Sequence, residues 1–179
     1  GWIATATGIL AVAGALVWST AQAALPVGSK APGFETRGAK AGKVFTLRLS
    51  EALKKGPVVL YFFPAAFTPG CTAEAHEFAE ATDDFTKAGA TVIGMSADPV
   101  DKLAKFSTEH CRDKFAVASA GPKIIEGYQV PLPLKVGLTD RTTYVISRTG
   151  RIAYSYSAMD YRDHVKNALA AVRSMQQAR

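Results

Sequence analysis

Cysteine is scarce in this chain of 179 residues, which contains only Cys71 and Cys111. Two cysteines can form at most one disulfide within the chain, so a fold held together by several disulfides is excluded. A C-x-x-C motif is also absent, because the residues after Cys71 are Thr72-Ala73-Glu74. This argues against an exported thiol–disulfide oxidoreductase. A copper-binding protein would need two closely spaced cysteines and a histidine, and the segment 71–75 offers no such pair.

Charged residues are missing from the first 29 positions. The first charged residue of the chain is Lys30. Residues 3–18 are mostly apolar, and Ala21-Gln22-Ala23 matches the A-x-A pattern at which signal peptides are cut. We therefore expect residues 1–23 to be a signal peptide and residues 24–179 to be the mature domain. The basic start of a signal peptide is lacking and the chain begins with Gly1, so we expect the leader to be truncated here. Export predicts a periplasmic or secreted protein.

An uncleaved membrane anchor is the alternative for the same segment. The apolar stretch 3–18 is, however, shorter than the roughly 20 residues that a membrane-spanning helix needs. We therefore expect no stable membrane insertion once the leader is removed.

Long basic runs are lacking as well. Lys and Arg number 21 against 15 Asp and Glu, and the formal charge of +6 is scattered along the chain. Scattered charge is typical of a solvated surface, so we expect no nucleic-acid partner. A chain with 48% hydrophobic and 20% charged residues is expected to fold as one globular domain.

The period of the apolar residues predicts the secondary structure. Buried strands are expected to alternate with helices, which predicts an α/β fold: a central sheet with helices on both faces. A final hairpin leads to a terminal helix capped by Asp160. The expected strands are 44–48, 58–63, 91–96, 115–120, 142–147 and 152–157, and the expected helices are a short one from 50, 71–88, 99–114 with Asp98 as N-cap, a turn at 123–128, and one after 160.

The chemistry-bearing segment runs from Pro64 to Cys71, where a loop leaves the buried strand 58–63. It places the thiol of Cys71 in the first turn of a helix, where free N–H groups and the helix dipole favour the thiolate form. Thr68 lies three residues earlier and can direct its hydroxyl toward the sulfur or toward a bound oxygen. Pro64 is expected to fix the turn and to shield one side of the pocket.

Pro64, Thr68 and Cys71 match the P-x-x-x-T-x-x-C motif, and the chain thereby resembles the peroxiredoxins of the AhpC/TSA superfamily. Thr68-Pro69-Gly70-Cys71-Thr72 resembles the Q-type, or bacterioferritin-comigratory, branch. The resemblance extends from about Val27 to the terminal helix and implies a thioredoxin-like fold. It also implies a thiol peroxidase that reduces hydrogen peroxide and organic hydroperoxides through a sulfenic acid on Cys71, without a metal or organic cofactor.

Arg141 enters the expected strand 142–147, as the active-site arginine of the family does. A carboxylate at Glu74 would oppose the thiolate of Cys71 unless a cation neutralised it, and Arg141 can supply that charge. By the resemblance, the arginine contacts both sulfur and peroxide, and the glutamate holds the arginine in place.

Cys111 is the candidate resolving thiol. Many Q-type members place this thiol five residues after the first cysteine, where this chain has His76. A subset of the branch uses the next helix, where we expect Cys111, and a disulfide with Cys71 would then require local unwinding of both segments. A buried, inert Cys111 and a one-cysteine mechanism stay open as alternatives.

The remaining expectations concern partners. A thioredoxin-like or small-thiol reductant would recycle the enzyme, which we expect to be a monomer or a weak dimer. The three histidines His76, His110 and His164 follow no metal-ligand spacing, and no role is expected for them.

Overall fold

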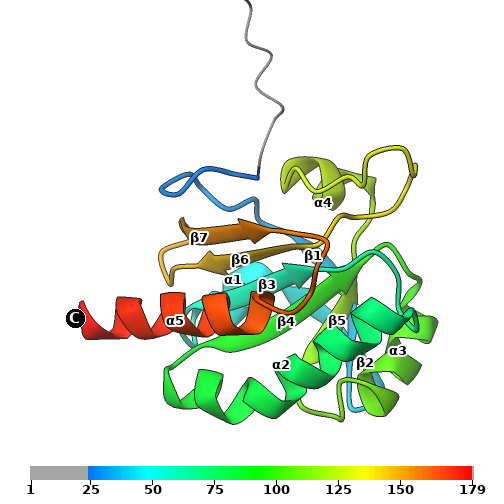
Figure 1. Cartoon of the computed structure of the whole chain (residues 1–179), viewed down its shortest axis with the longest axis horizontal. Helices are drawn as coiled ribbons and strands as arrows, with labels where there is room; N and C mark the ends of the chain where they lie inside the picture. Colours follow the sequence, from blue (N-terminus) through cyan, green and yellow to red (C-terminus); the bar gives the residue numbers. More distant parts are fainter. Residues whose placement is uncertain (1–23, 179) are drawn as a thin grey trace, which may run out of the picture.

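The computed structural model describes residues 24–178 (Figure 1). The expected signal peptide at 1–23 lies outside the described residues. Within 24–178, no helix has the length and apolar content needed to cross a membrane. The strands are β1 (Glu35–Lys40), β2 (Lys43–Arg48), β3 (Val58–Phe62), β4 (Thr91–Ser96), β5 (Ala116–Ser119), β6 (Thr142–Ile146) and β7 (Ile152–Ser157). The helices are α1 (Leu49–Leu53), α2 (Pro69–Lys87), α3 (Val100–Glu109), α4 (Pro122–Gly127) and α5 (His164–Gln177).

All seven strands form one mixed sheet in the order β2-β1-β5-β4-β3-β6-β7. The pairs β3–β4 and β4–β5 are parallel, whereas β6 runs antiparallel to β3, and β7 antiparallel to β6. The thioredoxin-like α/β fold predicted from the sequence is therefore confirmed.

Strand β3 lies inside the sheet, between β4 and β6, and contributes side chains to two cores. Successive side chains of a strand point to opposite faces. Val59, Tyr61 and Phe63 belong to one buried cluster, and Val58, Leu60 and Phe62 to the other. This explains why the segment is an unbroken apolar run.

Helices cover both faces of the sheet. The buried side chains of α2, α3 and α5 pack into the first cluster, and those of α1 and α4 into the second. Figure 1 shows α2 and α5 side by side on one side of the sheet. The start of α2 therefore lies where β3 ends and beside the cluster that contains Phe63.

Strand β1 was not predicted from the sequence. Its residues, ETRGAK, give no alternation of apolar and polar side chains. Gly38 explains the missing signal, because a Cβ atom at this position would lie 3.2 Å from the Cβ of Ala118 on β5. The strand is held by close backbone packing rather than by apolar side chains.

Two helix boundaries predicted from the sequence are wrong. Helix α3 ends at Glu109 rather than near residue 114, since Arg112 and Asp113 adopt φ angles of 52° and 62° in the left-handed region. Without glycine there, the sequence gives no stop signal. Helix α5 begins at His164, not after Asp160, because the Asp160 carboxylate accepts the backbone N–H of Arg162 in a turn that precedes the helix.

Candidate active site

Phe63, the residue before the loop from Pro64 to Thr68, is held by two hydrogen bonds. The N–H of Phe63 donates to the carbonyl of Met95 at 3.0 Å, and the buried hydroxyl of Thr139 donates to the carbonyl of Phe63 at 2.8 Å. Pro64, half-buried, follows directly, where its ring restricts the backbone at the exit from β3. The loop thus starts from a fixed point.

Asp98 holds the middle of this loop. Its carboxylate accepts the N–H of Ala66 at 2.8 Å and the hydroxyl of Ser96 at 2.7 Å, and it contacts the ammonium of Lys102 at 3.0 Å. The prediction that Asp98 is the N-cap of the following helix is wrong, because Pro99 occupies that position. The carboxylate is used instead to satisfy a backbone donor of the loop.

Thr68 precedes α2 as its N-cap residue, with extended backbone. Its hydroxyl donates to the carbonyl of Ala65 at 2.7 Å rather than to the sulfur of Cys71. The hydroxyl hydrogen is therefore occupied, and the oxygen lone pairs remain free to accept a hydrogen from a ligand. Phe67, just before it, has a φ of 68°, a strained conformation for a non-glycine residue.

Cys71 is the third residue of α2 and is 2% exposed. The first N–H bond of the helix runs from Thr72 to the carbonyl of Thr68, so the N–H groups of Gly70 and Cys71 precede the intrahelical ladder. These donors and the helix dipole create a positive potential at the sulfur.

Arg141 lies one residue before β6 and is brought to Cys71 by the pairing of β6 with β3. Its Nη2 is 3.5 Å from the Cys71 sulfur, its Nη1 donates to Glu74 Oε1 at 2.8 Å, and its Nε donates to the carbonyl of Met159 at 2.8 Å. Arg141 is 5% exposed, and all three nitrogens of its guanidinium have a partner. Gly70 leaves room for it, since a Cβ there would lie 3.2 Å from Nη2.

The charge of Arg141 is maintained by its partners. Burial by itself would lower the pKa of Arg141, but the facing Glu74 and Cys71 more than offset this, and the pKa is raised. Arg141 therefore stays a cation at the sulfur.

Glu74 is fully buried and has an unusual environment for a carboxylate. Burial raises the pKa of Glu74 to about 8, although Arg141 beside it acts in the opposite direction. Its Oε1 is bound by Arg141, whereas Oε2 has no hydrogen-bond partner among residues 24–178. A buried carboxyl group with a hydrogen bond to only one of its oxygens is costly to ionise, which agrees with the raised pKa of Glu74.

His164 completes the buried group and was missed by sequence reasoning. Its Nδ1 lies 3.9 Å from Glu74 Oε2 and 2.8 Å from the hydroxyl of Thr143, and its Nε2 lies 2.7 Å from the carbonyl of Ala158. Burial lowers the pKa of His164, which favours the neutral ring. No motif in the sequence signals this role, because α5 carries the histidine to the site from far along the chain.

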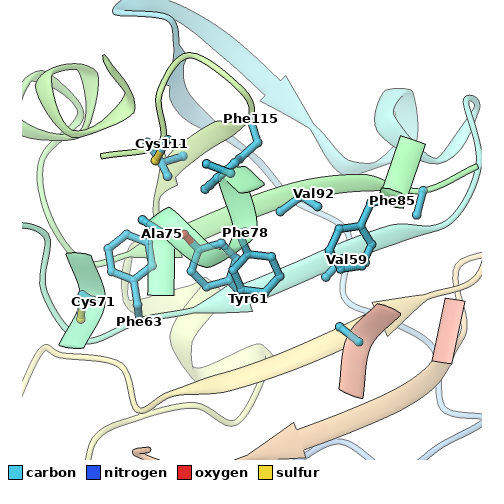
Figure 2. Packing of buried hydrophobic residues seen from close by; sticks show 14 of the residues in the cluster. Val59, Tyr61, Phe63, Cys71, Ala75, Phe78, Phe85, Val92, Cys111 and Phe115 are labelled. Atoms are coloured by element: carbon cyan, nitrogen blue, oxygen red, sulfur yellow. The ribbon is translucent and has the colours of Figure 1, made fainter. Parts of the chain in front are cut away.

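Cys111 lies in the turn after α3, not on the helix as expected, and both cysteines are free thiols. It is fully buried in the same apolar cluster as Cys71. Figure 2 shows the two cysteines at separate places in this cluster, with the ring of Phe63 between them in the view. Cys71 lies in a helix and Cys111 in a turn. One helix turn and one loop would therefore have to open for a disulfide to form.

Comparison with known proteins identifies the family of the chain. The AhpC/TSA family matches residues 27–155 of the chain, which is more than half of it. The chain belongs to the AhpC/TSA family. It is 31% identical over 156 residues to peroxiredoxin Bcp of Bacillus subtilis, covering 84% of this chain and 97% of that protein.

Two further relatives belong to the same branch. Chloroplastic peroxiredoxin Q of Oryza sativa is 34% identical over 149 residues, covering 83% of this chain and 67% of that protein. The crystal structure of peroxidoxin BcpB from Mycobacterium tuberculosis has a TM-score of 0.74 at 34% identity, covering 83% of this chain and 97% of the other. The chain is thus a peroxiredoxin of the Q type, an enzyme that reduces peroxides with a thiol. The alternatives of an exported thiol–disulfide oxidoreductase and of a copper-binding protein are not favoured.

The raised pKa of Glu74 predicts a dependence of stability on pH. Between its ordinary value of 4.5 and about 8, the folded chain binds more protons at this carboxyl than the unfolded chain does. Glu74 therefore makes its whole contribution to the free energy of unfolding at acidic pH. This contribution is lost as the pH rises through about 8. Glu74→Gln removes this dependence. Urea denaturation of both proteins, each carrying Cys71→Ser to remove thiol ionisation, should show the variant gaining relative stability from pH about 5 to about 8.5. A constant difference would contradict the prediction.

Proposed function

We propose that Cys71 is the residue that attacks the peroxide. The observation that carries this is the contact of 3.5 Å between its sulfur and the buried guanidinium of Arg141, at the N-terminus of α2. A permanent cation and free N–H groups at one sulfur stabilise the thiolate, which is the nucleophilic form. No other thiol among the described residues has such partners, since Cys111 is surrounded by apolar side chains.

The reaction proceeds by displacement at oxygen. The Cys71 thiolate attacks the terminal oxygen of the peroxide, an S–O bond forms, and the O–O bond breaks. The leaving oxygen departs as hydroxide or alkoxide and takes up a proton to give water or an alcohol. The sulfur is oxidised to sulfenic acid while the peroxide is reduced.

Arg141 and Thr68 are placed to act on the peroxide. The guanidinium is held by Glu74 and the carbonyl of Met159, so it can stabilise charge developing on the leaving oxygen without first reorganising. The lone pairs of Thr68 can accept the peroxide O–H, because its own hydrogen is donated to Ala65. Pro64 shields the pocket from one side, and the backbone N–H of Cys71 supplies a further donor.

Cys111 resolves the sulfenic acid within this proposal. Burial raises the pKa of the Cys111 thiol well above its ordinary value, so the thiol reacts only after it leaves the apolar cluster. The resulting disulfide with Cys71 is then reduced by a thioredoxin-like protein or a small thiol. Both cysteines of the cycle lie in one chain, and a monomer or weak dimer therefore suffices.

Removal of the proposed groups should abolish or strongly slow peroxide reduction. Cys71→Ser should consume no peroxide, and Arg141→Ala should slow consumption by about 10²–10³-fold, the usual effect of losing a preorganised donor. Stopped-flow measurement of hydrogen peroxide decay with reduced protein tests this. Arg148→Ala is a matched control, because Arg148 is exposed and its guanidinium donates to the carbonyl of Lys54, away from Cys71. Full activity of Cys71→Ser would refute the assignment.

The intact mass of the oxidised protein should identify the resolving step. One equivalent of peroxide should remove two hydrogens from the wild-type chain, as expected for a Cys71–Cys111 disulfide. Cys111→Ser should instead retain one added oxygen on Cys71 until an external thiol is supplied. A wild-type product that also carries one added oxygen and no disulfide would indicate the one-cysteine mechanism.

We also propose that the protein is exported to the periplasm or secreted. The apolar segment 3–18 and Ala21-Gln22-Ala23 support this, as sequence features outside the described residues. Protein recovered from an exporting bacterial host should begin at Ala24. Both tryptophans, Trp2 and Trp18, would then be gone, so indole fluorescence should be absent. Recovery of the chain with its leader attached to the membrane fraction would contradict cleavage.

A further inference from the structure

Cys111 lies in a segment, residues 110–113, that contacts α2 on both sides of the cysteine. On one side, His110 Nδ1 lies 3.0 Å from His76 Nε2. On the other side, Arg112 Nη1 lies 3.7 Å from Glu80 Oε1. His76 and Glu80 are one helical turn apart and so lie on the same face of α2. Cys111 therefore cannot leave its buried position without loss of these contacts.

The histidine contact is the stronger of the two. The side chains of Arg112 and Glu80 are 50% and 70% exposed, and exposed ion pairs of this kind contribute little. The two imidazoles are half-buried, and the ring of His110 also packs against Phe106 and Phe67 at centroid distances of 5.5 and 5.4 Å. A hydrogen bond that is partly shielded from water is expected to hold the segment more firmly than the exposed ion pair does.

The backbone of the same segment favours release. Arg112 and Asp113 both have positive φ angles, in a region that non-glycine residues rarely adopt. The turn is kept in this conformation by its contacts, among them the bond from the N–H of Asp113 to the carbonyl of Ser107 at 3.0 Å. Once the contact to α2 is broken, the strain favours a different conformation of the turn.

Imidazole chemistry makes this contact sensitive to protonation. A hydrogen bond between two neutral rings needs one N–H and one bare nitrogen, and each ring can supply either. When both rings are protonated, two N–H groups and two positive charges face each other, so the bond is lost. The other charges facing His76 are Arg112 from the cysteine segment and Glu80 from α2. Burial, together with Arg112 and His110, lowers the pKa of His76 and so favours the neutral form of this ring near neutral pH.

We propose that His76 and His110 form a latch that holds the Cys111 segment on α2 and controls how fast the Cys71 sulfenic acid becomes the Cys71–Cys111 disulfide. This rests on the proposed resolving role of Cys111. When the latch opens, Cys111 sulfur attacks the sulfur of the sulfenic acid, an S–S bond forms and the S–O bond breaks. The hydroxyl leaves with the proton of Cys111 as water, and no further oxidant is needed. Both histidines are positioning residues, and acidification opens the latch.

The test is the rate of disulfide formation in a single turnover. Reduced protein is mixed with one equivalent of hydrogen peroxide, quenched with an alkylating reagent at successive times, and analysed by mass. His76→Ala and His110→Ala should each form the disulfide roughly five- to tenfold faster than the wild type at pH about 7.5, as loss of one hydrogen bond predicts. The double variant should be no faster than either single one. The preceding consumption of peroxide should be unchanged.

The dependence on pH separates a latch from a merely structural contact. Each rate is compared with that of His76→Gln, whose amide can still hydrogen-bond His110 but cannot gain a proton. His76→Gln should match the wild type at pH about 7.5, and the ratio of wild-type to variant rate should rise toward pH about 5.5. Glu80→Gln is the control for the weaker contact and should change the rate less than about twofold. Urea denaturation of each variant shows whether the fold is retained.

The outcomes distinguish the two proposals. A disulfide that forms at the same rate in the wild type and the histidine variants overturns the latch alone. A ratio of the wild-type rate to the His76→Gln rate that does not change with pH also overturns the latch. Absence of any disulfide in every protein, with peroxide still consumed, overturns both the resolving role of Cys111 and the latch. Absence of peroxide consumption in the wild type overturns the assignment of Cys71 itself.

Discussion

A buried guanidinium between a thiol and a carboxyl is the interaction on which this site depends. Arg141 is 5% exposed and has Cys71 at 3.5 Å and Glu74 at 2.8 Å. Placing a cation in such an environment is costly unless its partners are fixed, and here the fold fixes them. The mixed sheet brings the start of β6 beside the end of β3, α2 begins at the same edge, and α5 closes the group with His164.

The two thiols of the chain share one apolar cluster but differ in their polar neighbours. Cys71 is at a helix N-terminus with a cation beside it, an arrangement that favours the charged, reactive form. Cys111 is enclosed by apolar side chains, which disfavour any charge. A catalytic cycle that uses both must therefore move the second cysteine. The half-buried contact between His76 and His110 joins the residue before Cys111 to α2.

Much of the fold followed from the sequence because the signals are local. The apolar run of β3 and the helical spacing of α2 predicted their elements directly. Strand β1 escaped prediction because Gly38 packs by its backbone, and the end of α3 escaped because Arg112 and Asp113 take left-handed conformations without glycine. In these places tertiary contacts, rather than residue type, decide the conformation.

The sequence by itself determined which sulfur lies in the first turn of a helix and which residues surround it in the motif, because hydrophobic periodicity and backbone sterics act over a few residues. Tertiary structure alone decided that His164 faces Glu74, that His76 meets His110 across 34 positions, and that the hydroxyl of Thr68 turns to Ala65. Such contacts depend on how whole helices and strands pack together. A short segment of sequence does not specify which distant residues it will meet.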